Sequence, residues 1–489
     1  MVDNNGIKPK SIKLNYIYNL LYEAFALLTP LITTPYISRV LGAEGVGVYS
    51  YTYSIAQYFV LLGNLGVTTY GQMVIANCRE DREKISRSFY ELWILRLITM
   101  LISFGIYLTI SLISTEYRSA RIILGIYVLA AAFDLTWFFR GIEDFFKVMG
   151  RNFIVKIFMV AMIFLFVKTE NDVTLYVLFI ALSTFLGNMT FIVSARGLLC
   201  KVSIQSLNIK QHLKPTLVYF IPTIAISVYT LLDKTMLGLL TVGTAQNGYY
   251  EQAHKIEQIL LVVLTSLNTI MRSRMSFLYQ QGRINEMRVR LNKSISFISL
   301  VAIPMTAGLI GISSNFIPFF LGVGFNESIV LLRIFSFLLI IIGLSNCLNT
   351  HFLGPSGRQG KNNYVLLMGA LVNFCFNYMM IPQYGAKGAA IGSVLAEILI
   401  LLGYLVLIND FFKVTTLVKL IWRYVIAGSV MGILVASLET VSQVKLLALV
   451  VQISLGIVSY GIIVLLLKDK FALGFINEII NKIRYRHVL

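Results

Sequence analysis

Charged residues are scarce in this sequence. They make up 13% of its 489 residues, hydrophobic residues make up 57%, and the mean hydropathy is +0.78. A water-soluble chain cannot bury that much apolar surface. The composition therefore excludes a soluble globular protein and indicates an integral membrane protein.

Cysteine and histidine are also rare, with four of each. The cysteines (Cys78, Cys200, Cys347 and Cys375) show none of the paired spacings of a disulfide framework or a zinc site. The chain lacks a P-loop, a Rossmann glycine pattern and a metal-spaced histidine cluster. We therefore predict that the protein is not an enzyme and expect neither a cofactor nor a firmly bound metal.

Acidic residues are fewer than basic ones, 23 against 41, which gives a formal net charge of +18. In a membrane protein such an excess sets the topology of the loops, so we expect no nucleic-acid partner. The basic N-terminus precedes an apolar stretch that continues to about Val40 without a small-residue cleavage site. We interpret this stretch as a first span rather than a signal peptide.

What the chain does contain is a series of apolar runs of about 20 residues, the length that crosses a bilayer as a helix. We predict an all-α integral membrane protein with fourteen transmembrane helices. Their ranges are 15–40, 46–67, 88–113, 120–139, 152–168, 173–196, 215–241, 248–272, 291–312, 328–352, 362–381, 386–409, 417–437 and 444–467.

The loops between these ranges differ in charge from one side to the other. Loops that share a side with both termini carry most of the basic residues, and basic loops remain cytoplasmic. We therefore predict a multi-pass membrane protein with both termini in the cytoplasm. The basic residues on that side include Lys8, Lys10, Lys13, Arg79, Arg82, Lys84, Arg87, Lys201, Lys210, Lys214, Arg283, Arg288, Arg290, Lys293, Lys482, Arg484 and Arg486.

Two stretches, 38–57 and 233–256, indicate an internal repeat. Both contain a basic residue, Leu-Gly, a short spacer, Gly and Tyr. We predict two lobes of six helices (1–205 and 206–412), with two further helices and a cytoplasmic tail in 413–489. The alignment pairs Arg39, Leu41, Gly42, Gly47 and Tyr49 with Lys234, Leu237, Gly238, Gly248 and Tyr249 or Tyr250.

Ionisable side chains within the spans are the candidate site residues, because a charge at membrane depth is costly and usually faces a bundle interior or a watery cavity. Asp233 and Lys234 are adjacent and do not face one another on a helix. Each needs a partner, with Glu251 and Lys255 the nearest candidates. Glu257 is a further charge near the same join, and the buried candidates elsewhere are Arg96, Asp134, Arg333 and Glu397.

The eighth range carries a polar stripe with the spacing of one helix face. The first range has a similar stripe that includes Glu23 and is interrupted by Pro30 and Pro35. Such stripes line water or pack against another polar helix face, and the sequence leaves both interpretations open. The stripe on the eighth range consists of Glu251, His254, Gln258, Thr265, Thr269 and Arg272.

Oxygen-bearing side chains suggest a cation site. Asn373 and Asn377 lie one turn apart on the eleventh range, at a depth similar to that of Asp233. Ser393 follows in a small-residue stretch that permits close helix contact. Oxygen ligands suit a small hard cation, and interhelical hydrogen bonding is the alternative interpretation.

Three segments resemble the Wzx-like polysaccharide repeat-unit flippases: WFFRGIEDFFKVMGRNFIVKI from Trp137, LLDKTMLG followed by GYYEQAHKI, and IPQYGAKGAAIGSVLAE from Ile381. The resemblance implies the superfamily that also holds multidrug antiporters and the lipid II flippase. It implies two six-helix lobes forming a V around a central cavity, with two helices appended. The implied substrate is an undecaprenyl-pyrophosphate-linked oligosaccharide, moved from the inner to the outer leaflet for O-antigen, capsule or exopolysaccharide synthesis.

The resemblance to lipid II flippases implies cavity cations that bind the pyrophosphate and a cation site on helices seven, eleven and twelve. Lys234 stands where an arginine is common, and Asn377 where an acid would complete the site, which weakens both expectations. The coupling ion would be Na⁺ or H⁺. The substrate-binding set is Arg39, Lys234, Lys255, Arg272, Glu23, Glu251 and His254, and the cation set is Asp233, Asn373, Asn377 and Ser393.

The expected mechanism is alternating access driven by an ion gradient or the membrane potential. The expected partners are the lipid-linked oligosaccharide, the lipid bilayer, and a polysaccharide polymerase and glycosyltransferases. One alternative is a cation-coupled multidrug antiporter of the same fold, which the basic cavity residues disfavour. The other is a non-transporting scaffold of a glycan assembly complex.

Overall fold

The computed structural model describes residues 12–438 and 445–474, and these residues form helices and turns without any β-strand. The all-α fold predicted from the sequence is confirmed. The chain divides into two compact units, the N-unit (Met1–Gly248) and the C-unit (Tyr249–Leu489). The basic residues of the two termini, 1–11 and 475–489, lie outside the described residues.

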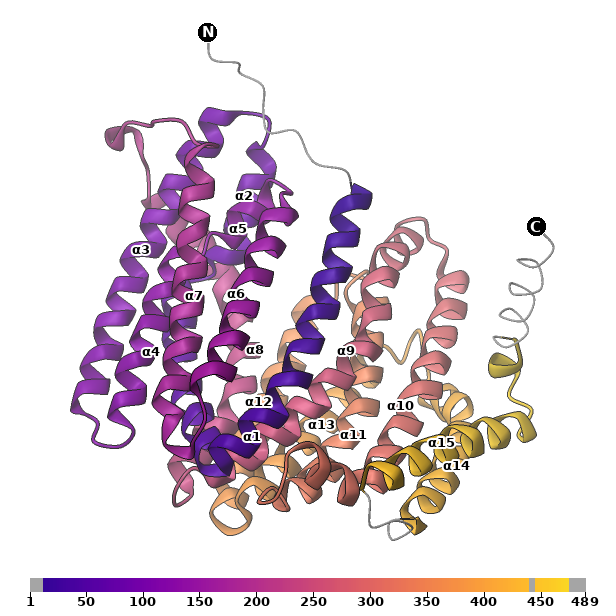
Figure 1. The fold of residues 1–489 in the computed structure, drawn as a ribbon. Coiled ribbons are helices and arrows are strands. Elements are labelled where there is room, and N and C mark those ends of the chain that lie inside the picture. Colours follow the sequence, from indigo (N-terminus) through magenta and orange to yellow (C-terminus); the bar gives the residue numbers. More distant parts are fainter. Residues whose placement is uncertain (1–11, 439–444, 475–489) are drawn as a thin grey trace, which may run out of the picture. The chain divides into compact units, whose positions relative to one another are not determined.

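The N-unit contains the helices coloured indigo to magenta in Figure 1. α9 (Ala245–Gln280) begins in the last residues of the N-unit and continues into the C-unit. The helices of the N-unit are α1 (Ile12–Asn64), α2 (Val67–Cys78), α3 (Arg82–Ile113), α4 (Arg118–Ala130), α5 (Thr136–Gly141), α6 (Phe145–Phe166), α7 (Val173–Arg196) and α8 (Lys210–Leu240), with 3₁₀ turns η1 (Ala131–Phe133), η2 (Glu170–Asp172) and η3 (Ile204–Ser206).

The C-unit contains the rest of α9 and the helices coloured from pink through orange to yellow in Figure 1. Among these helices, α12 packs along α13, and α10 packs against both α11 and α14. Their bounds are α10 (Ile284–Phe320), α11 (Glu327–Leu348) with a π-helical turn η4 (Asn349–Leu353), α12 (Gln359–Tyr384), α13 (Ala386–Leu407), α14 (Val414–Ser437) and α15 (Lys445–Leu466).

Eleven segments of the described chain are long and apolar enough to cross a membrane. Each of the fourteen predicted ranges overlaps a helix, and the first two ranges both overlap one segment, Leu28–Cys78. α8 and α9, which carry much of the predicted site, are not among the eleven. The protein is therefore a multi-pass membrane protein, and the number of fourteen spans stays a prediction.

α8 packs against α1 and α2 and belongs to the N-unit. The predicted lobe boundary after residue 205 precedes this helix, whereas the compact units divide within the first turn of α9. Packing in one conformation does not define which segments move together during transport. The two predicted lobes and the final helix pair therefore stay a prediction.

α1 combines the first two predicted spans and is interrupted at Gly42, where the backbone is non-helical (φ 64°, ψ −177°). This left-handed φ is readily adopted by glycine because it lacks a Cβ atom. Pro30 and Pro35, the bend sites suggested by the sequence, lie inside the helix. The chain therefore turns between the two spans at a glycine.

The aromatic segment that carries part of the family resemblance is a core element of the N-unit. Trp137 and Phe139 of α5 are fully buried. The Trp137 ring stacks on Phe89 of α3 with 5.7 Å between centroids, and the Phe139 ring stacks on Phe191 of α7 at 5.1 Å. These ring contacts hold α5 between α3 and α7, so these aromatic residues stabilise the fold.

Arg96 of α3 is also buried in the N-unit and is only 2% exposed. Its Nη2 atom lies 3.7 Å from Oδ2 of Asp134, at the end of η1. Its Nε and Nη1 atoms have no hydrogen-bond partner among the described residues. The burial rules out snorkelling of Arg96 to the membrane surface.

We expect Asp134→Asn to lower the free energy of unfolding by about 3–5 kcal/mol, because it leaves a buried guanidinium without its counter-charge. Unfolding of the purified protein in detergent measures this loss. Asn at position 134 still accepts the hydrogen bond from the Thr136 backbone N–H. The double variant Arg96→Met/Asp134→Asn removes both charges and should recover most of the stability. Equal destabilisation by the single and double variants would contradict an interaction between the two charges.

Candidate functional site

Two helical hairpins of the N-unit meet at their turns. The first hairpin lies in α1, and the second joins α8 to α9. Gly47 lies so close to Thr244 that a Cβ atom would overlap the Thr244 carbonyl oxygen, and Gly248 lies in the same way against the Ala43 carbonyl oxygen. Only glycine permits such an approach of two backbones. We call Ala43, Gly47, Thr244 and Gly248 the hairpin contact.

The hairpin contact is reciprocal. Gly47 follows Ala43 by four residues, and Gly248 follows Thr244 by four residues. Gly47 faces the carbonyl oxygen of Thr244, and Gly248 faces the carbonyl oxygen of Ala43. Each glycine thus meets the residue that lies four positions before the glycine of the other hairpin. A two-fold relation between equivalent segments produces this kind of mutual contact. The contact has the arrangement expected of two equivalent segments, and the internal repeat stays a prediction.

The register of that repeat differs in part from the sequence alignment. Gly42 and Gly243 both have a positive φ, 64° and 72°, and each precedes the close-contact glycine of its hairpin by five residues. The turn geometry thus favours pairing Gly42 with Gly243 rather than with Gly238, whereas it pairs Gly47 with Gly248 as the sequence alignment did. The sequence alignment matched the dipeptide Leu-Gly, which both stretches contain. The turn geometry instead matches the glycines that have a left-handed backbone.

Glu44 of the first hairpin caps the second one. Its Oε1 atom accepts hydrogen bonds from the backbone N of Thr244 at 2.9 Å and from Oγ1 of Thr244 at 2.8 Å. A carboxylate at this position also interacts favourably with the positive end of the α9 dipole. The sequence analysis missed Glu44, although an acidic residue within a repeated glycine turn was an available signal.

Side-chain contacts fix α8 against α1 near the predicted site. Oγ1 of Thr235 lies 3.0 Å from Oγ of Ser54 in α1. The Lys234 carbonyl accepts a hydrogen bond from Nδ2 of Asn247 at 2.6 Å, which joins the end of α8 to the start of α9. Of the predicted site residues in the N-unit, Asp233 is buried, Lys234 is half-buried and Arg39 is exposed.

In the C-unit, the predicted stripe on α9 contains paired as well as exposed residues. Nζ of Lys255 lies 3.3 Å from Oε1 of Glu251, one turn earlier. Nε2 of His254 lies 3.3 Å from Nε2 of Gln258, and Arg272 is exposed. Because Lys255 and Glu251 form an ion pair, α9 offers an anion less positive charge than the sequence suggested.

The predicted oxygen-bearing residues of α12 and α13 lie close together. Nδ2 of Asn377 donates to Oδ1 of Asn373 at 3.2 Å, and both side chains are fully buried. A Cβ atom on Gly392 of α13 would lie 2.6 Å from Oδ1 of Asn377. Oγ of the neighbouring Ser393 lies 3.3 Å from the Tyr250 hydroxyl. The close approach of these two helices, predicted from small residues, is confirmed.

The predicted site residues are divided between the two compact units. Arg39, Asp233 and Lys234 belong to the N-unit, and the others with described side chains belong to the C-unit. The side chains of Glu23 and Thr269 lie outside the part of the chain that the structure describes. The common substrate cavity and the cation site therefore stay predictions.

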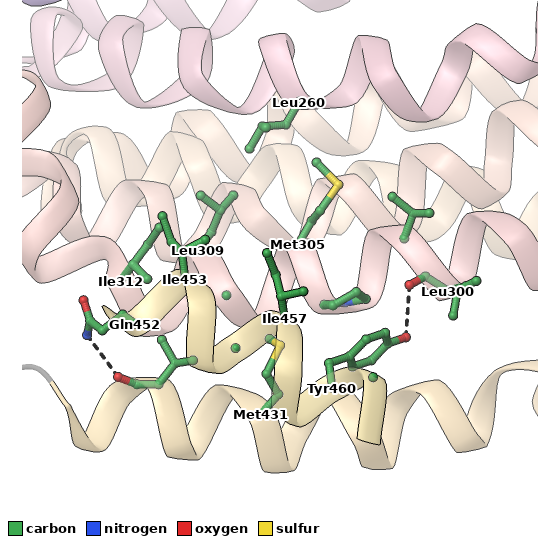
Figure 2. A pocket seen from close by; sticks show the side chains of 16 residues that line it. Leu260, Leu300, Met305, Leu309, Ile312, Met431, Gln452, Ile453, Ile457 and Tyr460 are labelled. Atoms are coloured by element: carbon green, nitrogen blue, oxygen red, sulfur yellow. Dashed lines mark hydrogen bonds between the residues drawn. The ribbon is translucent and has the colours of Figure 1, made fainter. Parts of the chain in front are cut away.

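The C-unit contains an apolar pocket of about 630 Å³, formed by α10, α14 and α15 with Leu260 of α9. Figure 2 shows that its polar side chains are engaged with the backbone. The Tyr460 hydroxyl donates to the Leu300 carbonyl at 3.0 Å, and Nε2 of Gln452 donates to the Val435 carbonyl at 3.0 Å. The pocket thus presents hydrocarbon and fits an apolar chain. The sequence analysis treated α14 and α15 as appended helices and missed it.

Comparison with known proteins agrees with the resemblance in the sequence. Residues 12–271, more than half of the chain, match the family described as "Polysaccharide biosynthesis protein". A "Putative O-antigen transporter" of Escherichia coli (strain K12) is 22% identical over 395 residues, which cover 80% of this chain and 95% of that protein.

Solved structures share the fold. The lipid II flippase MurJ in an inward closed conformation matches with a TM-score of 0.72 and 17% identity, over 92% of this chain and 97% of MurJ. An inward-facing multidrug resistance transporter of the MATE family, in the MOP superfamily, matches with a TM-score of 0.62 and 14% identity, over 83% and 96% of the two chains. The chain therefore belongs to the polysaccharide biosynthesis protein family and has the fold of the superfamily that holds the Wzx-like flippases.

Proposed function

We propose that this protein moves an undecaprenyl-pyrophosphate-linked oligosaccharide from the inner to the outer leaflet of the bacterial cell membrane. The apolar pocket of the C-unit carries this proposal, because such a substrate needs a path for its long hydrocarbon tail. Membrane lipid is as apolar as the pocket, so the pocket holds the tail by van der Waals contact rather than by the hydrophobic effect. The O-antigen transporter among the relatives supports the polysaccharide part of the substrate.

The proposed mechanism is alternating access. By the charge of the loops, both hairpins lie on the outer side of the membrane. We assign the hairpin contact the role of the closed outer gate, so that transport requires the two turns to separate. Glycine at the contact lets the turns meet backbone to backbone, and the hydrogen bonds of Glu44 stabilise the closed arrangement.

The pyrophosphate is proposed to bind the basic residues of the predicted cavity through charge-assisted hydrogen bonds. An inside-negative membrane favours outward movement of an anion by about 2.3 kcal/mol per charge for each 100 mV. A pyrophosphate with roughly two charges would gain about 5 kcal/mol if it crossed the whole field alone. An inward Na⁺ or H⁺ would reset the transporter, with Asp233, Asn373, Asn377 and Ser393 as the predicted cation ligands.

This function places both termini in the cytoplasm, where the lipid-linked unit is assembled. The protein would receive its substrate from glycosyltransferases, deliver it to a polysaccharide polymerase and catalyse no covalent step itself. A multidrug antiporter remains the alternative of the same fold, and protection of cells against cationic dyes would favour it. A scaffold would tolerate neutral residues at Lys234 and Arg39 without loss of polysaccharide export.

Flipping in liposomes tests the proposed function. Purified protein, a polyprenyl-pyrophosphate oligosaccharide and a membrane-impermeant glycosidase outside the vesicles report how fast the glycan crosses. We expect wild-type protein to accelerate digestion. Lys234→Ala should slow it about ten- to a hundredfold, because a hydrogen bond to a charged group contributes about 1.5–3 kcal/mol.

The matched control is Lys387→Ala, since the Lys387 side chain is partly exposed and pairs with Glu327 at 2.7 Å. It should flip at the wild-type rate. Wild-type protein that is no faster than empty liposomes, with several glycans and with imposed ion gradients, would exclude the flippase and favour the antiporter or the scaffold.

A further inference from the structure

Glu257 of α9 is a fully buried carboxyl group of the C-unit. α9 begins at Ala245, so Glu257 lies about 18 Å along the helix at ~1.5 Å per residue. This distance corresponds to the middle of a hydrocarbon core that is about 30 Å thick. An ionised carboxylate at this depth is costly unless a counter-charge or several hydrogen bonds stabilise it.

The hydrogen bonds around Glu257 do not provide that stabilisation. Oε1 has no hydrogen-bond partner in the described part of the chain. Oε2 accepts a hydrogen bond from Nε2 of the neighbouring Gln258 at 3.2 Å. Nε2 of His254, one turn earlier, lies 3.9 Å from Oε2. The carboxyl group therefore has an unused oxygen and a titratable imidazole as its basic neighbour.

A second carboxyl group near Glu257 is that of Glu397 in α13. Two carboxylates of like charge in an apolar interior disfavour simultaneous ionisation. Tyr404 of α13 is a further titratable group in this region, and from α11 the non-titrating ring of Phe335 packs on His254. The charged pair Lys255 and Glu251 lies on the adjoining face of α9. The groups around Glu257 thus favour a carboxyl that holds a proton.

His254 and Gln258 connect this buried group with the polar stripe of α9. Gln258 is exposed and His254 is half-buried, whereas Glu257 is buried. Nε2 of Gln258 lies within 3.3 Å of both the His254 ring nitrogen and the Glu257 carboxyl. The Gln258 amide nitrogen and the His254 ring nitrogen lie 3.2 Å and 3.9 Å from Oε2 of Glu257, and nitrogen is a poorer ligand of a hard cation than oxygen. The titratable imidazole makes this arrangement suitable for the binding of a proton.

We propose that Glu257 is a proton-binding site that takes up and releases one proton in each transport cycle by way of His254. This rests on the proposed function, which needs an inward ion to reset the transporter. In the uptake step an N–H bond of the protonated imidazole breaks and an O–H bond forms on the Glu257 carboxylate, so that both charges disappear. The neutral acid is then stable in the interior, and release reverses the transfer.

The first measurement detects the proton itself and needs no substrate. Infrared spectra of the purified protein in lipid, recorded against pH, report the C=O stretch of a protonated carboxyl group. We expect a band in wild-type protein that disappears as the pH rises and is absent from Glu257→Gln. The matched control is Glu327→Gln, because Glu327 is a half-exposed carboxyl paired with Lys387, and it should retain the band.

The second measurement tests the coupling in the liposome assay. A gradient of one pH unit should shift the final distribution of substrate between the leaflets about tenfold for each coupled proton. We expect this shift for wild-type protein and for Glu327→Gln, and a ratio near one for Glu257→Gln. Glu257→Asp keeps a carboxyl group at this position and should restore part of the response.

The outcomes separate this proposal from the proposed function. A band that persists in Glu257→Gln, or an unchanged response of that variant to the pH gradient, would overturn the proton site. Wild-type flipping that responds to a sodium gradient and ignores a pH gradient would also overturn it, while the flippase would stand. If wild-type protein does not flip the substrate, the proposed function fails, and the infrared titration still decides whether Glu257 binds a proton.

Discussion

Replacing Gly47 by valine should abolish transport and hold the two hairpins apart. A Cβ atom at this position overlaps the backbone carbonyl oxygen of Thr244, which cannot rotate away as a flexible side chain does. Overpacking of this kind costs about 3 kcal/mol or more, so the closed arrangement should become at least roughly a hundredfold rarer. Gly248→Val should have the same effect from the other hairpin, because the contact is reciprocal.

Labelling of a cysteine measures the opening directly. Val46 is 1% exposed, so Val46→Cys in a cysteine-free background should react slowly with an impermeant maleimide added outside. Gly47→Val should make the reaction fast and stop polysaccharide export. Gly105→Val is the matched control, because a Cβ atom on Gly105 meets no atom within 4 Å. Identical labelling of Gly47→Val and wild type would show that the hairpin contact is no gate.

Filling the apolar pocket should impair transport of substrates with long tails. Gly308 lines the pocket, and a Cβ atom there would lie 3.8 Å from Cε of Met431, an ordinary contact distance. Gly308→Phe therefore places a ring in space that the proposed tail needs. A clash of about 1–3 kcal/mol with the tail corresponds to a rate that is roughly ten- to a hundredfold lower.

The chain length of the substrate separates a blocked tail path from a damaged protein. A short-chain pyrophosphate analogue that does not reach the pocket should be flipped by Gly308→Phe as fast as by wild type. Gly105→Phe adds the same ring on α3, where a Cβ atom meets open space, and should flip both substrates normally. Equal slowing of the short and long substrates by Gly308→Phe would mean that the pocket does not hold the tail.

The positions of the helices were predictable because the bilayer imposes a simple rule on sequence: a span needs about 20 apolar residues. The family was predictable from segments such as the one starting at Trp137. The fold gives the aromatic residues of that segment a packing role, which linear sequence does not reveal, since the partners Phe89 and Phe191 lie far away in the chain.

The helices and charged residues of the candidate site were predictable from the sequence, whereas the partners of those residues were not. Charge at membrane depth identified α8 and α9 as unusual, and it singled out Asp233, Lys234 and His254. It did not reveal that Lys255 and Glu251 pair with one another, or that Glu257 is fully buried. Helical periodicity places a residue on a face, and only packing decides what that face meets.

The sequence by itself determined the class of protein, the apolar runs that form its helices and the family, because each depends on local composition or on short runs of residues. The tertiary structure decided which glycines of the two turns correspond, the reciprocal approach of Gly47 and Gly248, the apolar pocket and the environment of Glu257. These features depend on backbone dihedral angles and on contacts between residues far apart in the chain. A dipeptide such as Leu-Gly can occur in a helix or in a turn, and only the folded backbone distinguishes the two.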